Sequence, residues 1–133
     1  MAWTRSNPLY PVSDVAASLR WYEEVCGFRA TLVHEGLHGP NYAVLYRDTV
    51  SIHLVRAAEA QHGVKPPVQA QFWVSDGFEE LFENAKRRGV RILEPIEQRS
   101  WGHRDFLLSD PDGNVVWITQ ALASQERSHH GAA

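Results

Sequence analysis

The sequence nearly repeats itself after 62 residues, and this repeat limits the folds that the chain can adopt. The tripeptide Val-Ser-Asp occurs at residues 12–14 and again at residues 74–76. A leucine and a glycine follow each copy at the same offsets, as Leu19 and Leu81 and as Gly27 and Gly89. Each copy predicts a strand, a helix and returning strands, and neither is large enough to bury its own apolar faces well. We therefore expect an α+β fold built from two βαβββ modules, with function located where the modules meet.

The 133 residues match the commonest size of a single domain. We expect one domain over residues 1–133, with a first module at about 7–55, a linker at 56–68, a second module at about 69–120 and a polar tail at 121–133. The tail is expected to be frayed, although it could also pack on a partner. His129 and His130 are interpreted as part of this tail and not as ligands.

Composition excludes several classes of protein. Cys26 is the only cysteine, which rules out an intramolecular disulfide and suits a reducing compartment. The formal charge of -3 with dispersed Lys and Arg offers no basic stripe for nucleic acid. Neither a signal peptide nor an apolar run of membrane-spanning length is present, so we expect a cytoplasmic protein without membrane contact. Phosphate loops and nucleophile elbows are also missing from the sequence.

The first module predicts a short strand at residues 9–12, which Pro8 and Pro11 push toward a sheet edge. Asp14 is the expected N-cap of a helix that Gly27 ends. The apolar side chains of this helix recur at helical spacing, as Val15, Leu19, Tyr22 and Cys26. Three further strands are expected at 28–34, 42–46 and 50–55, with a loop at 36–40 that contains His38.

The second module predicts a strand at residues 69–74, followed by a helix capped by Ser75 or Asp76 and stopped by Gly89. Its apolar stripe consists of Phe78, Leu81, Phe82 and Ala85. The remaining strands are expected at 90–93, 104–108 and 115–119. Residues 110–114, Asp-Pro-Asp-Gly-Asn, form a strong turn signal between the last two strands.

Several of these segments resemble the vicinal oxygen chelate superfamily, which includes glyoxalase I, extradiol dioxygenases, fosfomycin-resistance enzymes and bleomycin-resistance proteins. The resemblance covers about residues 7–120. It rests on the helix opening at 12–22, on Gly27-Phe28, on Ile52-His53-Leu54, and on the segment Trp101-Gly102-His103-Arg104-Asp105-Phe106 with the turn at 110–114. The Trp-Gly segment leads to an arginine and then to this turn. This combination is similar to the bleomycin-resistance branch in particular.

The resemblance implies the glyoxalase/bleomycin-resistance fold, in which the modules form paired incomplete barrels with helices outside a concave groove. Strand alternation then assigns side chains to the groove, because successive residues point to opposite faces. Val50, Ile52 and Leu54 form the more apolar face and should meet the helix. The side chains expected in the groove are Asn7, Leu9, Tyr42, Val44, Tyr46, Ser51, His53, Val55, Gln69, Gln71, Trp73, Asp105, Leu107, Val115, Trp117 and Thr119.

Metal-dependent members of this superfamily carry His, Gln or Glu at inward positions that correspond here to Asn7, His53, Gln69 and Trp117. A catalytic divalent ion needs three or four converging N or O donors, and tryptophan cannot serve as one. Asn7 and Gln69 are weak neutral donors, so only His53 remains a strong candidate ligand. We therefore expect no metal, no other cofactor and no catalytic residue.

Aromatic residues are the positive evidence for binding, since five Trp and four Tyr exceed what a small core requires. Flat rings that face a groove bind planar groups by stacking and cations by π attraction. The candidate ligand-binding residues are Tyr42, Tyr46, His53, Gln71, Trp73, Trp101, His103, Asp105 and Trp117. Trp73 and Trp117 could instead fill space, His53 could bond only its neighbours, and His103 could lie at the surface. Asp105 could pair with a cationic ligand group.

The resemblance implies a metal-free binding protein that sequesters a planar or cationic antibiotic-like small molecule in a crevice of a homodimer. In the resembled proteins each crevice draws residues from both chains. A charge of -3 is only mildly acidic, so the branch does not identify the ligand. One alternative is a metal-dependent lyase, isomerase or dioxygenase that uses His53. Another is an interaction module whose groove its own side chains fill.

Overall fold

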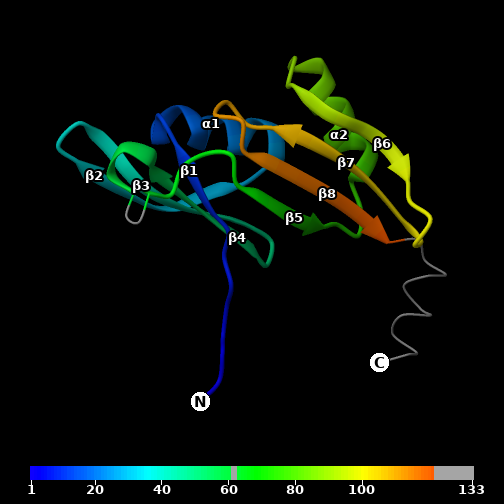
Figure 1. Cartoon of the computed structure of the whole chain (residues 1–133), viewed down its shortest axis with the longest axis horizontal. Coiled ribbons are helices and arrows are strands. Elements are labelled where there is room, and N and C mark those ends of the chain that lie inside the picture. Colours follow the sequence, from blue (N-terminus) through cyan, green and yellow to red (C-terminus); the bar gives the residue numbers. More distant parts are fainter. Residues whose placement is uncertain (61–62, 122–133) are drawn as a thin grey trace. The chain divides into compact units, whose positions relative to one another are not determined.

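The computed structural model describes residues 1–60 and 63–121, which fall into two compact units that each hold a four-stranded sheet and one α-helix (Figure 1). Within these ranges, the first unit comprises the described residues up to Val68 together with residues 111–114, and the second comprises residues 69–110 and 115–121. The expectations for the tail, including His129 and His130, concern residues outside the described ranges. In the described part of the chain, neither helix is long and apolar enough to cross a membrane.

Both units have the βαβββ order that the repeat predicted. The first contains β1 (Leu9–Val12), α1 (Val15–Cys26), β2 (Arg29–Gly36), β3 (Gly39–Arg47) and β4 (Val50–Arg56), followed by a 3₁₀ turn at Ala57–Glu59. The second contains β5 (Gln69–Trp73), α2 (Phe78–Arg87), β6 (Ile92–Gln98), β7 (His103–Ser109) and β8 (Val115–Ala121). The sheets have equivalent strand orders, β1-β4-β3-β2 and β5-β8-β7-β6, and in each the first strand pairs with the last in parallel. The predicted α+β fold is confirmed.

The two helices begin in different ways. The Oδ1 atom of Asp14 accepts a hydrogen bond from the Ala17 backbone N–H at 3.0 Å, which confirms the predicted cap of α1. For α2 the predicted cap at Ser75 or Asp76 is wrong, because Gly77 occupies the N-cap position with a φ of 72° and no side-chain cap. Two glutamates in the first turn of α2 compensate, since negative charge is favourable near a helix N-terminus.

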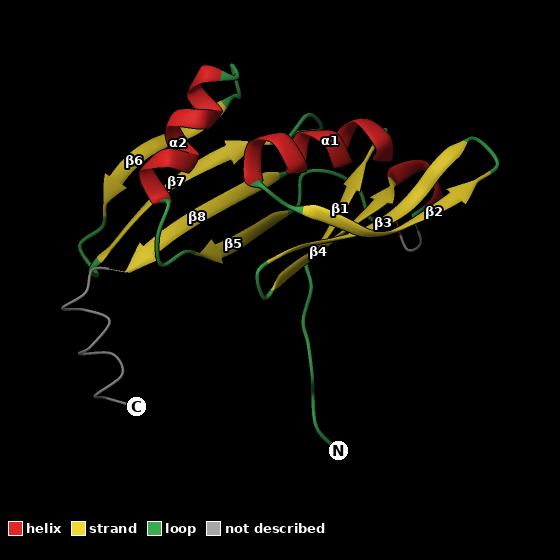
Figure 2. Ribbon diagram, turned by 180° about the vertical axis from the view of Figure 1, so that it is seen from behind, coloured by secondary structure: helices red, strands yellow, loops and turns green. Residues whose placement is uncertain are grey.

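Each helix packs on one face of its own sheet (Figure 2), and this apolar face follows the predicted alternation. In the first unit Ile52 and Leu54 are fully buried, and Tyr10 stacks on Tyr22 of α1 with ring centroids 5.5 Å apart. In the second unit Phe106 makes edge contacts with two phenylalanines of α2 at 4.9 and 5.1 Å. The helix-facing side chains therefore form the cores, and the opposite face of each sheet carries the polar residues.

Strand β6 is longer than predicted, and the extension matters for the site. The sequence indicated a strand at 90–93, whereas the observed strand begins at Ile92 and runs through Pro95 and its neighbouring glutamates, which are unfavourable in a strand interior. In the structure β6 continues to Gln98 as an edge strand, where proline is tolerated. The loop expected at 36–40 is likewise replaced by a hairpin in which β2 reaches Gly36 and β3 starts at Gly39.

Candidate functional site

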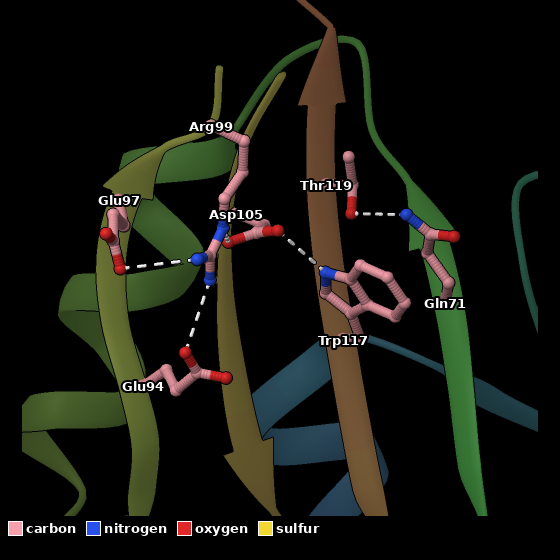
Figure 3. Close-up of polar contacts among 7 residues, drawn as sticks. All are labelled: Gln71, Glu94, Glu97, Arg99, Asp105, Trp117 and Thr119. Atoms are coloured by element: carbon pink, nitrogen blue, oxygen red, sulfur yellow. Dashed lines mark hydrogen bonds and ion pairs between the residues drawn. The ribbon is translucent and has the colours of Figure 1, made fainter. Parts of the chain in front are cut away.

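A network of hydrogen bonds and ion pairs lies on the face of the second sheet that is turned away from α2 (Figure 3). Its centre is Asp105 on β7, the strand that pairs with β6 and β8, and this residue is only 1% exposed. Asp105 Oδ1 accepts a hydrogen bond from Arg99 Nε at 2.9 Å, and Oδ2 accepts one from the Trp117 indole N–H at 3.0 Å. Both carboxylate oxygens are therefore occupied by partners within the protein.

Arg99 is surrounded by three carboxylates. Besides Asp105, its guanidinium lies 3.3 Å from Glu94 Oε1 and 3.4 Å from Glu97 Oε2, both on β6 (Figure 3). These acceptors, with the Asp105 hydrogen bond contributing most, raise the pKa of Arg99 above its already high ordinary value. Three carboxylates around one guanidinium leave a local excess of negative charge, carried by the more exposed glutamates.

The same arginine anchors the turn between β6 and β7. The Arg99 backbone N–H donates to the His103 carbonyl at 2.6 Å, and the Gly102 N–H donates to the Arg99 carbonyl at 3.2 Å. Trp101 lies within this turn and is 59% exposed. The guanidinium network thus connects the turn that carries Trp101 with the strand that carries Trp117.

An exposed aromatic side chain lies on the same sheet as this network. Trp73, at the end of β5, is 51% exposed, and its ring meets that of His103 edge-on with centroids 4.6 Å apart. Gln71, on the same strand, donates from Nε2 to the Thr119 hydroxyl at 2.9 Å (Figure 3). This face therefore offers the exposed Trp73 ring beside carboxylates and amides, a combination suited to planar ligands with donor or cationic groups.

The corresponding face of the first unit carries a different set of polar contacts. The Tyr42 hydroxyl lies 2.6 Å from His53 Nδ1, and the two rings meet at 87°. Ser51 donates to the side chain of Asn7, and Arg5 donates to the Tyr46 hydroxyl while its guanidinium carbon lies 5.9 Å from the centre of the Tyr46 ring. His53 Nε2 is buried and has no hydrogen-bond partner among the described residues.

Burial lowers the pKa of His53 below its ordinary value of 6.5, and the nearby charge of Arg5 adds a smaller effect in the same direction. As the pH falls below 6.5, the unfolded chain takes up this proton before the folded chain does, so the free energy of unfolding decreases. We expect His53→Gln to lack this part of the decrease. Urea denaturation of both proteins between about pH 5 and 7.5 measures it. If the free energies of unfolding of the two proteins change in parallel with pH, the lowered pKa of His53 is wrong.

The predicted site residues therefore fall into two groups. Tyr42, Tyr46 and His53 lie on the sheet of the first unit, whereas the other six candidates belong to the second. Asp105 does not present a free carboxylate to a ligand, as the sequence suggested that it could, because Arg99 and Trp117 already bind both of its oxygens. Sequence reasoning missed Arg99, Glu94 and Glu97, and the short stretch Gln-Arg-Ser before Trp101 gave no sign of this network.

The residues at the four metal-ligand positions do not fit a catalytic metal. Asn7 and His53 are engaged with Ser51 and Tyr42, and the indole of Trp117 donates to Asp105. Across residues 1–60 and 63–121, no three His, Cys, Asp or Glu side chains converge in a way that could hold a metal ion. A divalent ion needs such a convergence of donors, so we derive no step through a metal.

Comparison with known proteins identifies relatives over nearly the whole chain. Residues 6–118 match the family model of the Glyoxalase/Bleomycin resistance protein/Dioxygenase superfamily. Proteins named bleomycin resistance protein, from Geobacillus stearothermophilus and Staphylococcus aureus, are 30% identical over 90% of this chain and 98% of their own length. The crystal structure of TioX from Micromonospora sp. ML1 is similar with a TM-score of 0.77 at 24% identity, covering 89% of this chain and all of that one. A superfamily member from Sphaerobacter thermophilus has a TM-score of 0.72 at 25% identity, covering 90% of this chain and 98% of that one.

Proposed function

We infer that this chain, which belongs to the Glyoxalase/Bleomycin resistance protein/Dioxygenase superfamily, is a binding protein that sequesters a planar, antibiotic-like small molecule without changing it. The observation that carries the proposal is the exposure of Trp73 and Trp101 beside the carboxylate network of the second unit. Exposed apolar side chains that gather in one region of a surface, unlike single ones, mark binding sites. The relatives named bleomycin resistance protein support an antibiotic-like ligand.

The charge of this face favours a ligand that also carries a positive group. Glu94 and Glu97 are 47% and 59% exposed at their side chains, and together with Asp105 they outnumber the single Arg99 guanidinium. A cationic group on the ligand would gain from this excess, and indole rings add cation–π attraction. The proposal is therefore a planar ligand with cationic character, held by the tryptophans and the β6 glutamates.

A thermal-shift screen of planar heteroaromatic compounds, with bleomycin among them, tests this function. We expect at least one compound to raise the melting temperature in a concentration-dependent way, because a ligand that binds only the folded state stabilises it. Mass spectrometry of the compound recovered from the complex should show an unchanged mass. A product of altered mass that accumulates with time would instead support an enzyme of the same fold.

We also propose that the protein works without a metal. A chelator should leave both the melting temperature and the affinity for the compound unchanged, and the purified protein should contain no stoichiometric Zn, Fe, Mn or Ni. Elemental analysis of protein prepared without chelator is the measurement. One bound metal per chain that is lost together with His53 in the variant His53→Gln would contradict the metal-free mechanism.

We further propose that the binding protein is a homodimer. Strand β1 is an edge of its sheet, and exposed aromatic rings on a sheet face favour association. Light scattering over a range of concentrations should give the mass of two chains. If the protein is a monomer at every concentration, two chains cannot share a crevice, and this part of the proposal is wrong.

A further inference from the structure

The polar face of the first sheet differs in charge from that of the second. Residues in register on neighbouring strands share a face, so the pairing defines which side chains lie beside His53. The three rows on this face are Ser51, Tyr46 and Arg29; Leu9, His53, Val44 and Leu32; and Pro11, Val55, Tyr42 and His34. None of these rows contains an aspartate or a glutamate, in contrast to the carboxylate network of the second unit.

Arg5 adds a positive charge to this face without a carboxylate partner. Among the described residues, its guanidinium contacts only the Tyr46 hydroxyl and ring, and both belong to a neutral side chain. Tyr46 and His53 lie on adjacent strands, one row apart, at the diagonal spacing of about 7–8 Å. The charge of Arg5 also acts on His53, because it contributes to lowering the pKa of that side chain.

His53 supplies a second polar group on this face that lacks a partner. Its Nδ1 atom is bonded to the Tyr42 hydroxyl, whereas Nε2 is buried without a partner. Buried polar atoms in folded proteins are almost always hydrogen-bonded, so an unmatched ring nitrogen indicates that a ligand atom or water completes the site. His53 as a whole is partly exposed, so part of its side chain is already open to solvent.

We propose that this face of the first unit binds an anionic oxygen group, a carboxylate or a phosphate, through the Arg5 guanidinium and His53 Nε2. In the bound state the Tyr42 hydroxyl donates a hydrogen bond to Nδ1. Nε2 then carries the ring proton and donates a hydrogen bond to the anion. Hydrogen bonds from charged donors to anionic oxygens are the strongest of their kind. The inference concerns the first unit taken by itself and goes beyond the proposed function, which places the planar ligand on the second unit.

Nuclear magnetic resonance of histidine-labelled full-length protein tests this site with two probes, benzoate and inorganic phosphate, at constant ionic strength. We expect the His53 ring resonances to shift with millimolar addition of at least one probe, and the pKa of His53 to rise as the anion binds. A shift with benzoate alone identifies a carboxylate site, and a shift with phosphate alone identifies a phosphate site. Benzamidine, a planar cation, should leave His53 unchanged.

Variants of Arg5 separate a charge effect from a structural one. Arg5 is exposed and precedes β1, so its replacement should leave the fold intact. Arg5→Gln should weaken binding of the probe about tenfold, Arg5→Lys should restore most of it, and the matched surface variant Arg20→Gln should have no effect. Absence of any His53 shift, or equal affinity in Arg5→Gln, would overturn the inference. The proposed function is tested separately, because the planar compounds of the screen act on the second unit.

Discussion

Replacing Trp101 by alanine is expected to weaken binding of the planar compound identified by the screen roughly five- to a hundredfold, with only a small fall in melting temperature. A ring stacked on a planar group contributes about 1 to 3 kcal/mol through stacking and apolar burial, which corresponds to this range. Trp101 is 59% exposed in the β6–β7 turn, so the core does not depend on it. Isothermal titration calorimetry measures the loss without relying on tryptophan fluorescence.

The chain contains a matched control for this experiment. Trp3 is 94% exposed and precedes the first strand, so Trp3→Ala removes an exposed indole from outside the proposed site. It should leave the affinity unchanged, whereas Trp73→Ala should weaken binding in the same range as Trp101→Ala. If Trp101→Ala unfolds the protein and the remaining folded fraction binds normally, the ring is structural and does not contact the ligand.

Removal of the Arg99 guanidinium should have the largest effect on stability. The variant Arg99→Ala leaves the Asp105 carboxylate, 1% exposed, with the Trp117 N–H as its remaining partner in the network. An uncompensated buried charge is destabilising, so we expect Arg99→Ala to unfold at a clearly lower urea concentration than the unmodified protein. Urea denaturation measures this difference.

Two further variants test the origin of this loss. Arg91→Ala removes an exposed arginine of the same unit and should change stability by less than about 0.5 kcal/mol. Asp105→Asn keeps an acceptor for Trp117 and removes the buried charge, so the double variant with Arg99→Ala should be more stable than Arg99→Ala alone. A loss in Arg99→Ala as small as that in Arg91→Ala would show that the network contributes little.

Much of the fold was predictable because local signals agreed with the tertiary structure. Asp14 and Gly27 bound α1 as predicted, since a side-chain cap and a left-handed glycine are decided within a few residues. The alternation that placed Ile52 and Phe106 toward the helices also followed from strand periodicity alone. The second helix shows the limit of this reasoning, because Gly77 begins it without the side-chain cap that two neighbouring residues offered.

The candidate site was less accessible to sequence reasoning. Strand alternation placed Asp105 on the polar face, but its partner Arg99 is six residues away across a turn whose geometry the sequence did not define. Glu94 and Glu97 were overlooked because the strand that presents them runs through Pro95, which argues locally against a strand. The contact of Arg5 with Tyr46 was likewise not predictable, because it joins segments 41 residues apart in the sequence. The geometry of the β6–β7 turn and the pairing of distant segments, and not residue type, decide these contacts.

The indole N–H resonances of the five tryptophans test the central claim most directly during a titration with the compound from the screen, in the presence of a chelator. The account predicts that the signals of Trp73, Trp101 and Trp117 shift, that those of Trp3 and Trp21 remain in place, and that the recovered compound has its original mass. Unchanged signals for Trp73 and Trp101 at saturation, or a compound of altered mass, would contradict it.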